Sequence, residues 1–183
     1  MRLVRWSHHR AAVLAAVCCV GLLLAGAEPS SAASNMTVVS VTVMEVIEVL
    51  SWPQLHLNLE AVPEQPAVIG PLAFEVRANG PWGIFFVGDS PEGRIREFDI
   101  ASGTYVQGGR ALSRALEWSL SPSGPWMTVP EDGAALVSGR PPTGAGSEAV
   151  EFYLRLWPTY DDVPLPEGRE YRLVLTYTAG IGY

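Results

Sequence analysis

The sequence predicts an all-β fold, an antiparallel β-sandwich, and three observations support this prediction. Apolar and polar residues alternate at a period of two in most of the chain, which is typical of strands with one face in a core and the other toward water. Clusters of proline, glycine and asparagine separate these runs at short intervals. Only one short segment, residues 110–118, resembles a helix.

The expected strands come from six alternating runs and one run that is apolar on both faces. The alternating runs are residues 37–50, 55–59, 72–76, 116–120, 150–156 and 171–177. Residues 82–87 are apolar on both faces, which predicts a central strand of a sheet. Turn residues lie between these runs, and the Gly- and Ala-rich residues 143–147 predict a mobile loop.

The first run leaves two interpretations open. Val39, Val41 and Val43 alternate with Ser40 and Thr42, and apolar residues continue to position 50. Such a strand can pair with its own sheet, which we expect. It can also add to the open edge of a neighbouring subunit, where main-chain hydrogen bonds supply affinity and alternate side chains fill pockets.

Residues 1–33 are predicted to be a secretory signal peptide. Arg2, Arg5 and Arg10 form a basic start, a small and apolar run follows, and small-residue cleavage sites lie at residues 25–27 and 31–33. The alternative is a membrane anchor, since the apolar run of about 17 residues is at the short edge of what spans a bilayer. We expect cleavage, so that residues 34–183 form a single secreted domain, extracellular or at the cell surface, without a membrane segment.

The composition limits the partners of this mature chain. It has no cysteine, because Cys18 and Cys19 are the only two, and therefore no disulfide. Every one of the 12 basic residues is arginine, against 19 acidic residues, and removing residues 1–33 leaves a net charge of about −9. That charge makes nucleic acid and anionic membranes poor partners. The absence of lysine with abundant Arg, Gly, Ala and Pro indicates a GC-rich bacterial genome.

No catalytic or metal-binding motif stands out. His56 is the single histidine of residues 34–183, and a nucleophilic triad needs a histidine beside the nucleophile. It lies on the polar side of its run, which indicates an exposed strand residue. Asp161, Asp162 and Glu167 could bind calcium, but a solvated turn is the favoured interpretation. We therefore expect no enzyme, no metal and no cofactor, although a carboxylate pair for glycoside hydrolysis stays open.

The aromatic residues offer a second kind of site. Trp82 and Trp118 fall in apolar register and are expected in the core. Trp126, Trp157 and Tyr160 lie beside proline or turn residues and are expected at the surface. Exposed aromatic rings in a row stack on sugars, so these three are the candidate contact residues for a carbohydrate.

Three short stretches carry a family resemblance that spans residues 72–178. They are Asn-Gly-Pro-Trp-Gly-Ile-Phe-Phe-Val at 79–87, Glu-Trp-Ser-Leu-Ser at 117–121, and Pro-Glu-Gly-Arg-Glu-Tyr-Arg-Leu-Val-Leu-Thr-Tyr-Thr at 166–178. Together they resemble bacterial secreted immunoglobulin-like and WxL-like surface modules. Trp118-Ser119-Leu120 is a literal Trp-x-Leu, whereas Ile84 follows Trp82 in place of Leu, and Tyr177 stands where that family tends to have Trp.

The resemblance implies an extracellular immunoglobulin-like β-sandwich used for surface attachment or assembly, with no catalytic residue. The leading hypothesis is a non-enzymatic structural or adhesive surface module that self-assembles through its N-terminal strand. Its partners are then further copies of itself or a cell-surface polysaccharide. The alternative is a carbohydrate-binding module, and a small hydrolase comes third.

Overall fold

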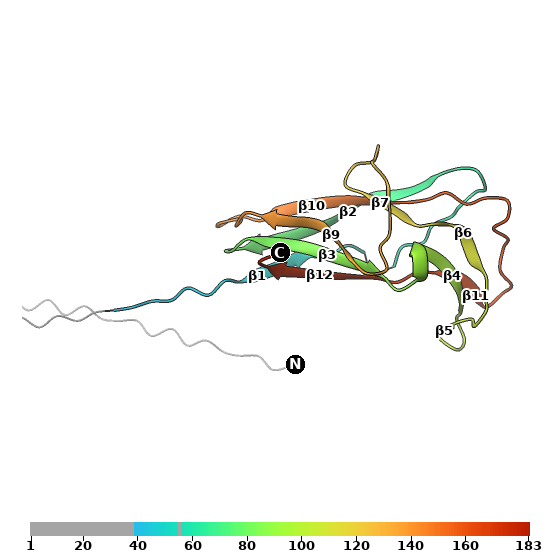
Figure 1. Ribbon diagram of the computed structural model, residues 1–183, viewed down its shortest axis with the longest axis horizontal. Helices are drawn as coiled ribbons and strands as arrows, with labels where there is room; N and C mark the ends of the chain where they lie inside the picture. The colour runs from blue at the N-terminus through green and yellow to red at the C-terminus, as the bar shows by residue number, and fades with distance from the viewer. Residues whose placement is uncertain (1–38, 55) are drawn as a thin grey trace, which may run out of the picture. The chain divides into compact units, whose positions relative to one another are not determined.

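The computed structural model describes residues 39–54 and 56–183, and in these residues the fold is all-β with antiparallel strands (Figure 1). Residues Thr42–Tyr183 form one compact unit. No helix in the described part of the chain has the length and apolar character needed to cross a membrane. The predicted signal peptide, residues 1–33, lies outside the described residues.

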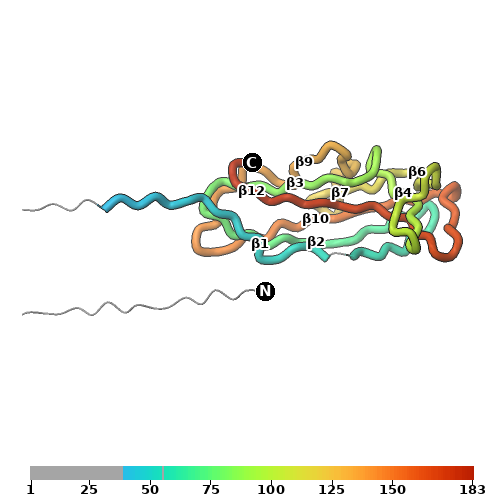
Figure 2. The backbone as a smooth tube through the Cα atoms, turned by 90° about the horizontal axis from the view of Figure 1, so that it is seen from below, coloured from blue at the N-terminus to red at the C-terminus, as the bar shows by residue number. Residues whose placement is uncertain are grey.

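The strands of the described residues belong to three antiparallel sheets. They are β1 (Ile47–Ser51), β2 (Ala67–Ala78), β3 (Trp82–Gly88), β4 (Arg94–Asp99), β5 (Thr104–Tyr105), β6 (Ala111–Ala115), β7 (Glu117–Ser119), β8 (Met127–Thr128), β9 (Ala134–Arg140), β10 (Glu148–Leu156), β11 (Arg169–Arg172) and β12 (Leu175–Ile181). One sheet has the order β1-β2-β10-β7-β8 and a second has the order β12-β3-β9. The third joins β11-β4-β5, with β6 also on β4, and gathers at one end of the unit (Figures 1 and 2).

The core lies between the five-stranded and the three-stranded sheets. In β2 the alternation is strict, with Leu72, Phe74 and Val76 buried and the residues between them exposed. The buried side chains of these two sheets form one cluster together with Leu112 of β6 and with Leu116 and Val129 of the connections. Its members are Leu72, Phe74, Val76, Ala78, Trp82, Ile84, Phe86, Leu112, Leu116, Trp118, Val129, Leu136, Val137, Val150, Phe152, Leu154 and Leu156. Two antiparallel sheets over a shared core are compatible with the predicted β-sandwich.

The three central predictions are confirmed. The run at 72–76 lies in β2, the run at 150–156 lies in β10, and the two strands pair in antiparallel register. Residues 82–87 form most of β3, which lies between β12 and β9, so the strand that is apolar on both faces is central. The helix-like residues 110–118 form strands β6 and β7 and no helix.

The predicted first strand is only partly right. β1 begins at Ile47 and pairs with β2 of the same chain, with Ile47 opposite Ala78 and Val49 opposite Val76. Residues 39–46 form no strand, although they carry the clearest alternation. An extended chain becomes a strand only beside a partner edge, and none of the described residues supplies one there.

The prediction of a strand at 55–59 is wrong for the part that the structure describes. Residues 56–66 contain no strand, and position 55 lies outside the described residues. Leu57 and Leu59 nevertheless pack against the core, and His56 is exposed as expected. The alternation thus reflects one-sided burial of an extended segment without a hydrogen-bonded ladder.

The last predicted run, 171–177, is divided between two sheets. β11 pairs with β4 and β12 pairs with β3, so the chain changes sheets at positions 173 and 174. The Val174 amide donates to Asp89 Oδ1 at 2.9 Å, and the Tyr105 hydroxyl donates to Asp89 Oδ2 at 2.6 Å. Burial and this hydrogen bond raise the pKa of Tyr105 to about 12. Asp89 therefore connects the two sheets where the chain crosses.

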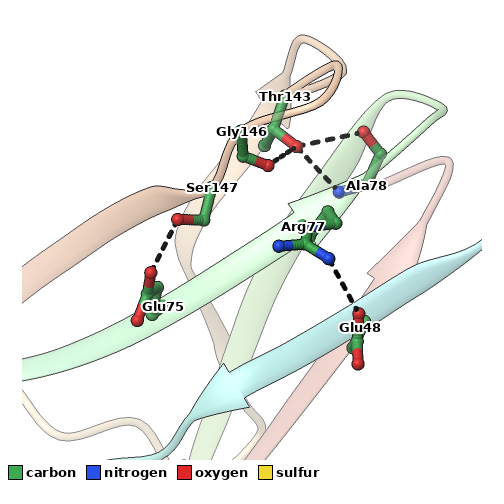
Figure 3. Close-up of polar contacts among 7 residues, drawn as sticks. All are labelled: Glu48, Glu75, Arg77, Ala78, Thr143, Gly146 and Ser147. Carbon is green, nitrogen blue, oxygen red and sulfur yellow. Dashed lines mark hydrogen bonds and ion pairs between the residues drawn. The ribbon is translucent and has the colours of Figure 1, made fainter.

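Hydrogen bonds hold the predicted loop at 143–147 to strand β2 (Figure 3). Thr143 Oγ1 accepts the Ala78 amide at 3.1 Å and donates to the Gly146 carbonyl at 3.0 Å. Ser147 Oγ donates to Glu75 Oε1 at 2.6 Å. Both ends of the loop are therefore held by hydrogen bonds to the last residues of β2.

Candidate functional site

The predicted contact residue Trp126 is half-buried and already has a partner. The Arg155 guanidinium lies 4.4 Å from the centre of its ring, in a cation–π contact. Arg155 is held in place by Glu117, the residue opposite it in the β7–β10 register, with Nε and Nη2 each 2.7 Å from Oε2. One face of the Trp126 ring is therefore covered by a fixed arginine.

Trp157 and Tyr160 lie in different surroundings. Trp157 is half-buried, its indole N–H has no hydrogen-bond partner among the described residues, and the Arg114 guanidinium lies 5.5 Å from its ring. Tyr160 is 79% exposed. Within the described part of the chain, none of the three candidate residues forms an aromatic pair with another. The structure therefore does not bring them together into a row of stacking rings.

The acidic loop near Tyr160 has a structural role. Asp162 accepts the Thr159 amide at 2.8 Å and the Ser113 amide at 2.7 Å, which ties the loop to β6. Burial raises the pKa of Asp162, but these hydrogen bonds outweigh it and hold the pKa below its ordinary value. No group of three metal-ligating side chains occurs in residues 39–54 and 56–183.

Glu97 is a buried carboxylate that the sequence pattern does not reveal. It lies in β4, accepts the Arg110 amide at 2.9 Å and forms an ion pair with Arg169 of β11. The Arg110 amide, followed by the Arg169 guanidinium, lowers the pKa of Glu97. Neighbouring residues of β4 give no sequence signal for this, because both partners come from distant parts of the chain.

Acid should destabilise the domain through Glu97. Its folded-state pKa lies below the ordinary 4.5, so the unfolded state binds the proton first as the pH falls. The charged Glu97 carboxylate therefore contributes its full stabilisation above pH 4.5, and this contribution is lost as the pH falls through the lower pKa of the folded state. Glu97→Gln should lower the urea midpoint at pH 7, and its deficit relative to the parent should shrink by pH 3.

The exposed Glu131→Gln is the matched control, because this carboxylate has no ion pair among the described residues. Its midpoint should follow the parent at both pH values. A Glu97→Gln deficit that stays constant from pH 7 to pH 3 would show that Glu97 acts by packing and not by charge.

The most unusual surface feature is the segment of residues 39–46, here called the N-terminal segment. Val39 and Val41 are each 80% exposed, Val43 and Met44 are each 78% exposed, and no hydrogen bond joins residues 39–43 to other described residues. Large apolar side chains exposed in series mark an interaction surface more often than single ones do.

Asn79 holds the base of the N-terminal segment. The Val46 amide donates to Asn79 Oδ1 at 2.6 Å, and Asn79 Nδ2 donates to the Met44 carbonyl at 2.9 Å. Asn79 follows the last residue of β2, so the segment is anchored to the β2–β3 turn. The clamp fixes where the segment leaves the domain and leaves residues 39–43 available.

A groove lies between β9 and the first half of β10. Its volume is about 290 Å³, and it is lined by Leu120, Val137, Arg140, Ala149, Val150 and Glu151. A further hollow of about 480 Å³ shares Leu120 and continues along β9 from Ala135 to Pro141. Leu120 is 46% exposed and so departs from the core register expected of it. We call these two hollows together the β9 groove.

These observations define the class of protein: an all-β chain with antiparallel sheets over one core, an exposed apolar N-terminal segment and an open groove. Comparison of the chain with protein-family models, with curated proteins and with solved structures finds no match. The resemblance to immunoglobulin-like and WxL-like modules accordingly stays a prediction from the sequence.

Proposed function

We propose that this protein is a non-enzymatic structural or adhesive module of a bacterial surface, exported by its N-terminal signal and built as an immunoglobulin-like sandwich. In this function the mature chain associates with further copies of itself. The observation that carries the proposal is the N-terminal segment, whose valines are exposed in alternation while its base is clamped by Asn79.

Exposure of these valines to water costs free energy. Burying a valine side chain completely is favourable by about 1.5–3 kcal/mol, so several exposed valines in one segment leave a large gain unrealised. The segment is uncharged from residue 39 to residue 44, in a chain that is acidic overall. An uncharged apolar strand is the part of such a chain that can approach another copy with least repulsion.

The carbohydrate-binding alternative has weaker support. Stacking on a sugar needs a free aromatic face, and arginines lie over the rings of both Trp126 and Trp157. Tyr160 is the one residue of the three candidates that is mostly exposed. A single exposed tyrosine is a common surface feature and points to no particular ligand.

The test is the size of purified residues 34–183 measured against protein concentration by light scattering, with electron microscopy of the largest species. We expect a mass that grows with concentration, and we expect a chain starting at Ile47 to stay monomeric because it lacks the N-terminal segment. Its spectrum in the far ultraviolet serves as the control for folding. A full-length mature chain that remains monomeric at every concentration contradicts the proposal.

A further inference from the structure

We propose that the β9 groove of one copy receives the N-terminal segment of a second copy as an added strand. The inference rests on the proposed self-association and goes further, because it names both surfaces that meet. Strand addition of this kind uses main-chain hydrogen bonds for affinity and alternate side chains for fit.

Two unpaired strand edges border the groove. β9 is the last strand of its sheet, paired with β3 on one side only. β10 pairs with β2 along its whole length, but β7 covers it only from Tyr153 to Arg155. Within the described residues, the first half of β10 therefore also has a free edge. The sandwich has room for one more strand at this place, on either sheet.

An open strand edge can pair with other chains and cause aggregation, so proteins usually protect such edges. Charged side chains, prolines or covering loops keep sheet edges from pairing with other chains. β9 has the sequence Ala-Ala-Leu-Val-Ser-Gly-Arg, in which the only charge is the final Arg140. Arg140 itself is engaged by Glu148, with Nη1 3.3 Å from Oε1. Towards the end of β9 the Gly139 amide donates to the Tyr183 carbonyl at 2.6 Å, and register shifts against β3 interrupt the strand. The uncharged edge available to an added strand is therefore Ala134–Ser138.

The N-terminal segment matches this acceptor in length and pattern. Five of its residues, 39–43, are free of the Asn79 clamp, beside the five residues Ala134–Ser138 of β9, and Val39, Val41 and Val43 point to one face when the segment is extended. In the groove, Leu120 is exposed and can receive such a face, whereas Val137 and Val150 are buried in the core. Ser40 and Thr42 would then face solvent.

A second copy fits the groove better than the same chain does. The segment leaves the domain beside β1, and β2 and β10 lie between β1 and the groove. Strands are about 4.8 Å apart, so reaching its own groove would cost about 14 Å, or about four residues at 3.3 Å each, before any pairing began. Only residues 39–43 are free of the Asn79 clamp, so that distance would use up most of them, whereas the same five residues of another copy can all pair.

Cysteine cross-linking tests the pairing directly, because residues 34–183 contain no cysteine of their own. Chains carrying Val39→Cys, Val41→Cys or Val43→Cys are each mixed with chains carrying Ser138→Cys on β9, with oxidised glutathione as oxidant. Thr176→Cys on β12 is the matched control acceptor, since it is also an exposed hydroxyl residue on an edge strand. A disulfide needs Cα atoms about 4.4–6.8 Å apart, so only neighbouring strands react efficiently.

We expect at least one donor position to form the mixed disulfide with Ser138→Cys several-fold faster than with Thr176→Cys. Equal rates for the two acceptors, or a faster reaction at Thr176→Cys, would overturn the β9 assignment. If the mature chain still associates in that case, the proposed self-association stands and only its acceptor is wrong. A mature chain that never associates contradicts both the proposed self-association and the proposed acceptor.

A mixing experiment provides an independent measurement. Val41→Asp places a charge in the donor, and Leu120→Asp places one in the acceptor at a position that is already exposed. Each variant alone should fail to form large assemblies, whereas a mixture of the two should form dimers that grow no further, since one intact segment meets one intact groove. A mixture that stays monomeric, or a Leu120→Asp chain that assembles as the parent does, contradicts the proposal.

Discussion

Replacing Trp118 with alanine should lower the free energy of unfolding by about 3–5 kcal/mol, as other large-to-small aromatic changes in cores do. Trp118 is 4% exposed on β7, and its ring meets Phe86 edge to face with centroids 4.9 Å apart. Phe86 belongs to β3 of the other sheet, so the substitution removes a contact between the two layers. Folded domains are stable by only about 5–15 kcal/mol, which makes this a large loss.

Urea denaturation followed by circular dichroism measures this loss without relying on tryptophan fluorescence. Leu120→Ala is the matched control, because Leu120 lies two residues further on and is 46% exposed. Its effect should stay within about 0.5 kcal/mol, as for other surface substitutions. A loss below about 1 kcal/mol for Trp118→Ala would mean that the ring contributes little to the core, and the strand register predicted for 116–120 would be wrong.

The alternation of apolar and polar residues predicts correctly those strands in which every second side chain is buried in the core. In β2 and β10 the alternation of Phe74 and Phe152 with polar neighbours reports a real core face, and the two rings stack with centroids 5.7 Å apart. The same alternation at Val39 and Val41 led to a wrong prediction of a strand. Periodicity reports which side of an extended chain is apolar, and it contains no information about whether a partner edge is available.

Contacts between distant residues explain what the sequence could not reveal about the fold. The break between β11 and β12 depends on the Val174 amide meeting Asp89 of an earlier turn. Burial of Glu97 depends on Arg110 and Arg169, which flank it only after folding. The local sequence pattern does not predict contacts between residues that are distant in the chain, since each partner resembles an ordinary surface residue in the sequence.

The candidate site was predicted unevenly for the same reason. Tyr160 is exposed as expected from its turn context. Trp126 and Trp157 are half-buried, and the guanidinium groups of Arg155 and Arg114 lie over their rings. The N-terminal segment was recognised as a strand with two possible partners, but the groove was not, since it arises where β7 stops short on β10.

Truncation from the N-terminus should separate the exposed segment from the strand that supports the fold. A chain starting at Ile47 keeps β1, and the described residues that it lacks, 39–46, are all exposed, so its free energy of unfolding should stay within about 1 kcal/mol of the full mature chain. A chain starting at Trp52 lacks β1 altogether. It loses the packing of Ile47 and Val49 against the core and exposes the paired edge of β2.

The expected cost of removing β1 is about 3 kcal/mol, from two half-buried aliphatic side chains and the uncovered neighbours, at about 25 cal/mol per Å² of apolar surface. The Glu48–Arg77 ion pair across β1 and β2, at 3.8 Å, adds little because both side chains are more than half exposed (Figure 3). Urea midpoints of the two truncated chains measure the difference. Equal midpoints would mean that β1 is dispensable, and a collapse already at Ile47 would mean that residues 39–46 belong to the folded monomer and are not free to reach a second copy.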